Sequence, residues 1–295
     1  MPLPIMTAFQ EKPPALDFIW PGFLAESVGA LVAPGAIGKS FFALEMAISV
    51  ACATDEGDLI QFAPTRSGKV VYLAGEDPES VLRHRFYTLG TYLSPNARHS
   101  VADNLVVESI VGQPLNLLED AHRARIIALG CNTRLIILDT LSRIHHLNEN
   151  DNSDMAQLLT TLEFIAANTG AAILFLHHVN KTSATTGQAD QPQAARGAGA
   201  LVDNVRWAGF LANMTDREAR RYACPPKHNP VGEEPRRRFV RFGVSKQNYA
   251  IASPDRWYQR HEGGVLLPAN VHPVRISRLK PKLVKEGHGY RAAVY

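Results

Sequence analysis

Cysteine is scarce in this chain of 295 residues, which contains three, at Cys52, Cys131 and Cys224. They lie far apart and lack the paired spacing of metal ligands or of a disulfide framework. The sparse, odd-numbered set therefore argues against a small disulfide-stapled fold and against a zinc site of the paired-cysteine type.

Long hydrophobic runs are also missing. No stretch is long enough to span a bilayer, and the N-terminus lacks the basic and then apolar pattern of a signal peptide. There is no strong charge of one sign either, since the formal net charge is +3, which is compatible with nucleic acid but does not identify it as a partner. We therefore expect a cytoplasmic protein with no membrane partner.

Short apolar runs alternate with helical stretches along most of the chain. Continuous apolar runs are typical of parallel strands buried on both faces of a sheet. With 45% hydrophobic residues, the chain can bury a sizeable core. The pattern predicts an α/β fold, a mainly parallel sheet flanked by helices, with antiparallel strands in the C-terminal part. Strands are predicted at 28–32, 69–74, 105–110, 135–140, 171–176, 206–211 and 239–244, a closing hairpin at 256–267, and helices at 41–48, 79–89, 119–129, 154–169 and 216–222.

A glycine-bearing loop ending in Gly-Lys-Ser lies between the first of these strands and its helix. In that context, backbone N–H groups and the helix N-terminus can surround the phosphates of ATP. Lys39 would reach the β- and γ-phosphates, and the Ser40 hydroxyl would hold Mg²⁺. Ala33 stands where a first glycine is expected, so Gly35 is expected to supply the flexibility; a chance Gly-Lys-Ser is the alternative. The predicted ATP-binding residues are Pro34, Gly35, Ala36, Ile37, Gly38, Lys39, Ser40 and Phe41.

Other polar residues follow the ends of later predicted strands. Asp139 ends a buried run and is in place to hold Mg²⁺ through water, the alternative being a helix cap. Glu76 directly follows a strand and could orient or deprotonate the attacking water, although it could instead belong to a capped helix start. Because the carboxyl ends of parallel strands share one edge of a sheet, these side chains should converge with the phosphate loop.

Two adjacent histidines end the predicted strand at 171–176. His178 could contact the γ-phosphate and report the nucleotide state to the segment that follows. His177 and His178 should point to opposite faces of the strand, so they cannot easily share one metal ion and one of them should face the site.

The motifs together resemble the RecA-type ATPases, and most closely the RepA family of hexameric plasmid replicative helicases. The resemblance covers roughly residues 16–268, while the Pro- and charge-rich segment 224–238 and the residues after Pro268 are unmatched. The stretches that carry it are 29–32, 34–35, 38–40, 72–73, 76–78, 138–141, 175–178, Lys181, 196–197, 201–204, 206–207, 240–246, 248–249 and 255–257.

This resemblance implies a RecA-like P-loop ATPase core that assembles into a ring of six subunits around single-stranded DNA, with ATP between neighbours. One subunit would supply the catalytic residues Lys39, Glu76 and His178, and the next an arginine finger, for which Arg206 is the first choice. Lys246 and Arg256 are the alternatives. A plasmid primase and initiator proteins are possible further partners.

The long polar segment at 179–199 would face the channel of such a ring, where Lys181 and Arg196 would contact the DNA backbone. The expected organisation is an N-terminal arm at 1–15, the ATPase and helicase domain at 16–268, and a basic, flexible tail at 269–295. That tail could itself touch DNA or only aid solubility. A filament-forming recombinase and a nucleotide-gated DNA-binding regulator remain alternatives to a helicase.

Overall fold

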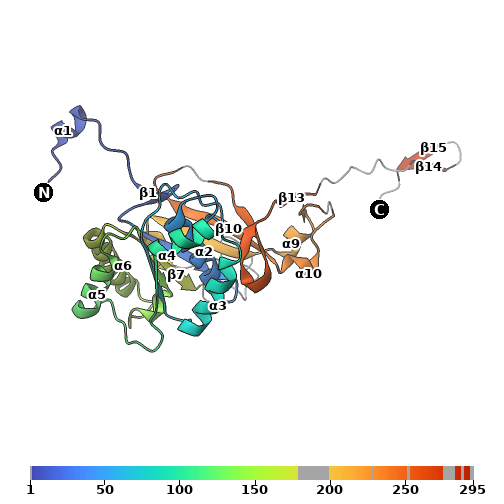
Figure 1. Cartoon of the computed structure of the whole chain (residues 1–295). Coiled ribbons are helices and arrows are strands. Elements are labelled where there is room, and N and C mark those ends of the chain that lie inside the picture. Colours follow the sequence, from blue (N-terminus) through green and yellow to red (C-terminus); the bar gives the residue numbers. More distant parts are fainter. Residues whose placement is uncertain are drawn as a thin grey trace.

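A nine-stranded sheet runs through the molecule in the order β12-β11-β10-β8-β3-β7-β6-β4-β5 (Figure 1). The computed structural model describes residues 2–178, 199–226, 229–250 and 253–274, and the backbone of 283–286 and 289–292. Six strands are parallel and three C-terminal strands are antiparallel, so the predicted fold class is confirmed. The parallel strands are β3 (Val28–Ala33), β4 (Val70–Ala74), β5 (Leu105–Ser109), β6 (Leu135–Asp139), β7 (Ala172–His178) and β8 (Trp207–Asn213), and the antiparallel ones β10 (Phe239–Gln247), β11 (Arg256–Arg260) and β12 (Leu266–Pro268).

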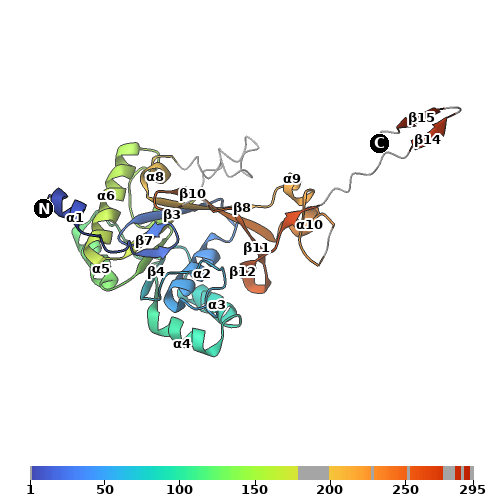
Figure 2. The ribbon, with the colours of Figure 1, turned by 90° about the horizontal axis from the view of Figure 1, so that it is seen from above.

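Helices cover both faces of the sheet (Figure 2). One layer contains α2 (Lys39–Cys52), α3 (Glu79–Gly90) and α4 (Pro95–Asn104), and the other α5 (Asp120–Gly130), α6 (Asn152–Thr169) and α8 (Gly199–Asn204). Strand β3 serves both layers, since Leu31 and Ala33 join the core beneath α2 while Ala30 and Val32 join the core beneath α6. This two-sided burial explains why the parallel strands are apolar at successive positions.

The helix after the phosphate loop, α2, is buried along nearly its whole length. A helix that is apolar on all sides needs neighbours on all sides, and α2 lies between the sheet and α4. Helix α6 has a more ordinary amphipathic pattern. Its Asp151 cap accepts hydrogen bonds from the backbone N–H groups of Ser153 and Asp154, and Gly170, at φ 73°, ends it.

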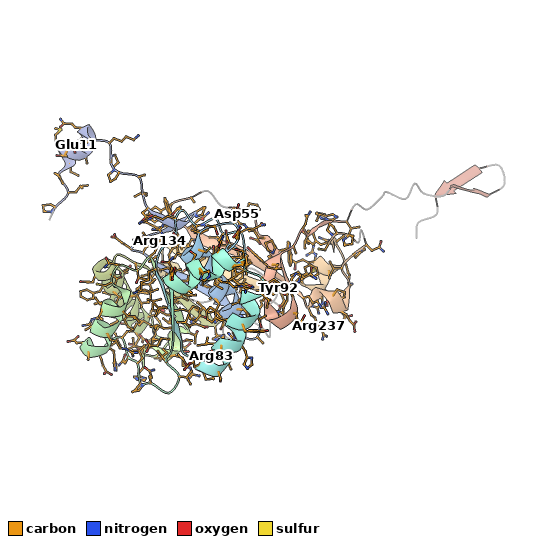
Figure 3. The ribbon with its side chains drawn as sticks, viewed as in Figure 1. Glu11, Asp55, Arg83, Tyr92, Arg134 and Arg237 are labelled. Atoms are coloured by element: carbon orange, nitrogen blue, oxygen red, sulfur yellow. The ribbon has the colours of Figure 1, made fainter. Side chains whose placement is uncertain are left out.

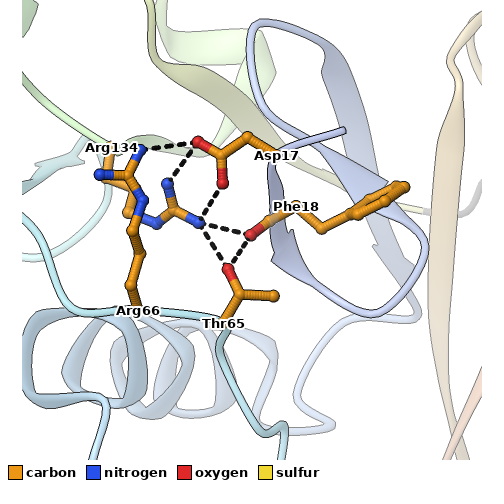
Figure 4. A network of polar contacts seen from close by, with 5 residues as sticks. All are labelled: Asp17, Phe18, Thr65, Arg66 and Arg134. Carbon is orange, nitrogen blue, oxygen red and sulfur yellow. Dashed lines mark hydrogen bonds and ion pairs between the residues drawn. The ribbon is translucent and has the colours of Figure 1, made fainter. Parts of the chain in front are cut away.

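A short N-terminal hairpin of β1 (Phe18–Trp20) and β2 (Phe23–Leu24) is anchored at the amino end of β6 (Figure 4). Buried Arg134 donates to both carboxylate oxygens of Asp17, at 2.9 Å each, and to the Thr65 hydroxyl at 2.7 Å. These contacts, with Arg66 at 2.7 Å, lower the pKa of Asp17 to about 2. The anchored hairpin therefore lies at the edge of the sheet opposite the phosphate loop.

A small lobe follows the carboxyl end of β8 and projects beyond the helical layers (Figures 1 and 2). It comprises α9 (Asp216–Ala219), β9 (Tyr222–Ala223) and α10 (Glu233–Arg236), and β9 pairs with β13 (His272–Pro273). The prediction of one helix over 216–222 was wrong. A capping box at Thr215 and Glu218 starts the helix, but it ends at Ala219 because Tyr222 and Ala223 pair with β13.

The two ends of the chain contain short elements. Helix α1 (Ile5–Gln10) extends away from the sheet on the N-terminal arm (Figure 1). Strands β14 (Leu283–Glu286) and β15 (Gly289–Ala292) form a hairpin within the segment predicted as a basic tail. None of the helices in the described residues combines the length and apolar composition needed to cross a membrane.

Candidate functional site

The predicted phosphate loop turns sharply between β3 and α2. Ala36 and Gly38 adopt left-handed conformations, with φ of 63° and 95°. Gly35 does not, so the positive φ angles of the loop fall at Ala36 and Gly38 rather than at Gly35. Gly38 is the position that needs glycine, because a positive φ strains other residues at the start of a helix. The buried side chain of Ile37 anchors the loop in the core.

Lys39 is 5% exposed, and its ammonium has no hydrogen-bond partner among the described residues. Burial lowers its pKa to about 8, although the charges of Asp139, Glu76 and Glu149 act in the opposite direction. A buried ammonium without a partner is destabilising on its own. An anion in the loop would provide the missing partner, so the position of Lys39 fits its predicted role as a phosphate ligand.

Asp139 ends β6 close to the same loop and is 2% exposed. Its Oδ2 accepts a hydrogen bond from the Tyr72 hydroxyl at 2.6 Å, while its Oδ1 has no partner among the described residues. Burial raises the pKa of Asp139, and the hydrogen bond from the Tyr72 hydroxyl acts against this rise. The short 3₁₀ turn that follows has Thr140 as its cap residue, so the structure does not support a capping role for Asp139.

Ser40 and Asp139 fit the predicted magnesium site. The free Oδ1 and the hydroxyl are hard oxygen ligands of the kind that Mg²⁺ prefers. In the described residues, no group of three or more His, Cys, Asp and Glu side chains is arranged to hold a metal ion. A Mg²⁺ ion here would therefore take most of its ligands from nucleotide oxygens and water, as P-loop sites do.

Glu76 lies beside this pair because the ends of β4 and β6 approach closely. The Gly75 N–H donates to the Asp139 carbonyl at 2.5 Å, and a Cβ at Gly75 would lie 2.7 Å from the Cβ of Arg143. The side chain of Glu76 is 37% exposed, and its Oε1 lies 3.6 Å from Nε2 of His178. The next helix takes Pro78 as its cap residue, so Glu76 is not needed to start it.

The two adjacent histidines contact different carboxylates, as their opposite directions along β7 require. Whereas His178 faces Glu76, His177 places its Nδ1 3.9 Å from Glu149. Burial and the charge of Lys39 lower the pKa of His177 to about 4, so it is neutral at pH 7. His178, which is 43% exposed, is the histidine available to a ligand in the loop.

The three candidate finger residues lie away from this cluster. Arg206 precedes β8, which runs parallel to β3, and its N–H donates to the carbonyl of Val28 at the start of β3. It is therefore at the amino edge of the sheet, and the cluster is at the carboxyl edge. The Lys246 ammonium donates to the Asp203 carbonyl, and the Arg256 guanidinium donates to the Gln61 carbonyl.

Two predicted DNA-binding residues, Lys181 and Arg196, lie outside the described residues. The structure also places one residue at the site that the sequence did not single out. Arg260, at the end of β11, donates to the Ile37 carbonyl in the phosphate loop at 2.6 Å. The predicted hairpin at 256–267 contained this residue, but the strand order was needed to bring its end to the loop.

Comparisons with known proteins bear on the family and the fold of this chain. A family model described as an AAA domain matches residues 2–184, which include the phosphate loop, Glu76, Asp139 and His178. Among solved structures, one described as an ATPase domain is similar at 12% identity, with 89% of this chain and 95% of that chain covered and a TM-score of 0.57. The RadB recombinase is also similar, at 14% identity, with 83% and 90% covered and a TM-score of 0.47.

The match to the solved ATPase domain concerns the fold, because the sequence identity is low. The fold is RecA-like, with a mainly parallel sheet flanked by helices and antiparallel strands after it. The family model spans more than half of the chain and includes the whole strand-end cluster. The protein therefore belongs to the AAA domain family and is a P-loop ATPase, with its phosphate loop at the carboxyl edge of the sheet.

Proposed function

We propose that this protein is an ATP-dependent replicative DNA helicase that works as a hexameric ring on single-stranded DNA in plasmid replication. The contact between Glu76 and His178 is the observation that carries the proposal. It joins a carboxylate placed to act on water to the end of β7, and the chain after β7 contains Lys181 and Arg196. Hydrolysis beside Glu76 could therefore change how tightly Lys181 and Arg196 bind DNA.

The residues at the site divide the work of phosphoanhydride hydrolysis. Lys39 and the backbone N–H groups of the loop neutralise the phosphate oxygens, and Asp139 with Ser40 would hold Mg²⁺. When bound, the ion polarises the phosphate oxygens and helps to align them. Glu76 orients the attacking water or accepts its proton, since its carboxylate is partly exposed and faces the site. His178 responds to the γ-phosphate through its neighbour Glu76.

Arg206 is the preferred arginine finger of the three candidates. Its side chain is exposed and has no ion pair or side-chain hydrogen bond within the described part of the chain. Lys246 and Arg256, in contrast, each donate to a backbone carbonyl of their own chain. Because Arg206 is at the opposite edge of the sheet from its own site, it would act in the site of a neighbouring subunit.

Strand displacement on forked DNA tests the proposal, with a single-stranded tail placed on one strand at a time. We expect ATP-dependent displacement with one of the two tails, and none by the Lys39→Ala variant. Hydrolysis stimulated by single-stranded DNA without displacement on either fork would contradict the helicase role. Negative-stain images with ATP would then distinguish rings from the filaments of a recombinase, and very slow hydrolysis would favour a nucleotide-gated regulator.

A further inference from the structure

The lobe beyond β8 is a folded unit with its own contacts. We define it as residues 214–238. Met214 and Ala219 pack with Phe239 in a separate hydrophobic cluster. Arg236 binds Asp216 at 2.7 Å and donates to the Met214 carbonyl at 3.1 Å, which ties α10 to the start of α9. These contacts therefore hold α9 and α10 in a fixed arrangement.

Arginine dominates the surface of this lobe. Its 25 residues include seven Lys or Arg and four Asp or Glu, an excess of three that equals the net charge of the whole chain. Two of the acids are already engaged, Asp216 by Arg236 and Glu218 by Arg241. Five arginines are exposed and form no ion pair or side-chain hydrogen bond with the other described residues. These are Arg217, Arg220, Arg221, Arg237 and Arg238.

The free arginines of α9 and the segment after it lie in the same part of the lobe as those that follow α10. Helices α9 and α10 contact each other, and the ion pair between Asp216 and Arg236 joins them. Arg217 and Arg237 are the next residues after the two members of that pair. Arg237 lies on the lobe, outside the helical layers (Figure 3), where Arg237 and Arg238 also line a hollow of about 590 Å³.

Exposed arginines without a protein partner suit phosphate oxygens, since the guanidinium fork can donate two parallel hydrogen bonds to one phosphate. The lobe lacks the second feature of single-strand binding, which is a set of aromatic side chains for base stacking. Tyr222 is the one Phe, Trp or Tyr residue among its 25. It is half-buried and packs against Trp257, with ring centroids 6.1 Å apart. A backbone-only surface of this kind fits duplex DNA better than single strands.

We infer that the lobe binds the phosphate backbone of duplex DNA next to the nucleotide site. The inference rests on the proposed function, because the lobe would bind the duplex that the helicase is about to unwind. The lobe begins where β8 reaches the carboxyl edge of the sheet. The Arg238 carbonyl accepts a hydrogen bond from the Arg260 N–H at 2.7 Å, and the Arg260 side chain contacts the phosphate loop. A duplex on the lobe would thus lie close to the loop that binds ATP.

Duplex binding by charge-neutralised variants tests the inference. We would measure the fluorescence anisotropy of a labelled, blunt 20-bp duplex from 50 to 200 mM KCl, with a non-hydrolysable ATP analogue present. The Arg237→Gln/Arg238→Gln variant should bind about tenfold more weakly. Its slope of log K against log[salt] should be smaller in magnitude by about 1.8, because each lost phosphate contact removes about 0.9. The triple variant Arg217→Gln/Arg220→Gln/Arg221→Gln should show a larger loss.

Two further variants show whether weaker duplex binding is caused by the loss of positive charge on the lobe. Lys12 and Lys69 are exposed lysines outside the lobe, so Lys12→Gln/Lys69→Gln removes the same charge and should leave duplex binding unchanged. Arg237→Lys/Arg238→Lys keeps the charge and should keep the salt slope. If the salt slope of this lysine variant falls as much as that of the glutamine variant, a contact between positive charge and the DNA phosphates is contradicted.

The inference is overturned if the glutamine variants bind the duplex with the affinity and salt slope of the control variant. If single-stranded DNA still stimulates their ATPase, the proposed function survives and only the role of the lobe is wrong. If the unaltered protein binds neither duplex nor single-stranded DNA with the ATP analogue, both the lobe inference and the helicase proposal fail.

Discussion

Lys39 shows how the demands of phosphate binding oppose those of stability. Its ammonium is buried without a partner, and its pKa falls from 10.5 to about 8. Below pH 8 the lysine carries its charge in both the folded and the unfolded chain, so the full penalty of burying that charge is present. As the pH rises from 8 to 10.5, only the unfolded chain keeps the proton, and the penalty disappears.

We therefore predict that Lys39→Met abolishes ATP binding and yet stabilises the nucleotide-free protein. The gain in the free energy of unfolding at pH 7 should be at most about 3 kcal/mol, since one pKa unit corresponds to about 1.4 kcal/mol. Urea denaturation from pH 7 to 10 measures it. The difference between variant and parent should shrink above pH 8, and a variant that is less stable than the parent at pH 7 would contradict this account.

Among the elements, the N-terminal hairpin depends on a single buried cation. Arg134 is at the amino end of β6, and its main partner is the carboxylate of Asp17. This contact lowers the pKa of Asp17 from 3.8 to about 2, chiefly through its hydrogen bonds with Arg134. The stabilisation is complete above pH 3.8 and is lost as the pH falls through 2.

Asp17→Asn should lower the free energy of unfolding at pH 7 by about 1–2 kcal/mol, because it leaves Arg134 without its charged acceptor and Asp17 is itself partly exposed. Urea denaturation at pH 7, 5 and 3 should show this difference narrowing only below pH 4. Arg66→Gln is the matched control, since the Arg66 side chain is 67% exposed and its removal should change stability by about 0.5 kcal/mol or less. A loss that is equally large in both variants would contradict a special role for buried Arg134.

Most strands and long helices could be predicted because their signal is local. The apolar runs that form β3, β4, β6 and β7 are buried on both faces. Each run is therefore apolar at successive positions and can be recognised from its own sequence. Helix α4 (Pro95–Asn104) was missed, because Val101 is the only large apolar residue in its sequence and one such residue cannot mark a helical period. The helix predicted over 216–222 ends early, at Ala219, because Tyr222 and Ala223 pair with the distant strand β13.

The residues of the candidate site also differ in how far the sequence could predict them. Lys39, Glu76, Asp139 and His178 follow predicted strands, so the rule that parallel strands end at one edge was enough to bring them together. Arg260 depends on an antiparallel hairpin folding back beside the phosphate loop, which needs the strand order. The positive φ angles of the loop, at Ala36 and Gly38, could not be predicted, because local composition does not reveal which residue takes such a conformation.

At the scale of the whole molecule, the two edges of the sheet have different roles. The carboxyl edge carries the nucleotide site, and Arg206 lies at the amino edge, where the hydrogen bond from its N–H to the Val28 carbonyl marks the start of β8. A subunit that offers Arg206 to a neighbour and receives another Arg206 at its own site makes a head-to-tail contact. Contacts of this type close into rings or continue as filaments.

Mixing two inactive variants tests whether the site is shared between neighbouring subunits. Glu76→Gln should slow hydrolysis by about 10² to 10⁴-fold, and Arg206→Ala by about 10³ to 10⁵-fold, with ATP binding kept in both. In mixed assemblies, some interfaces join an intact Glu76 to an intact Arg206 from the neighbour. We predict that ATPase activity in the mixture rises well above that of either variant alone, with a maximum near equal proportions. No recovery in assemblies shown to contain both variants would contradict a site that is shared between subunits through Arg206.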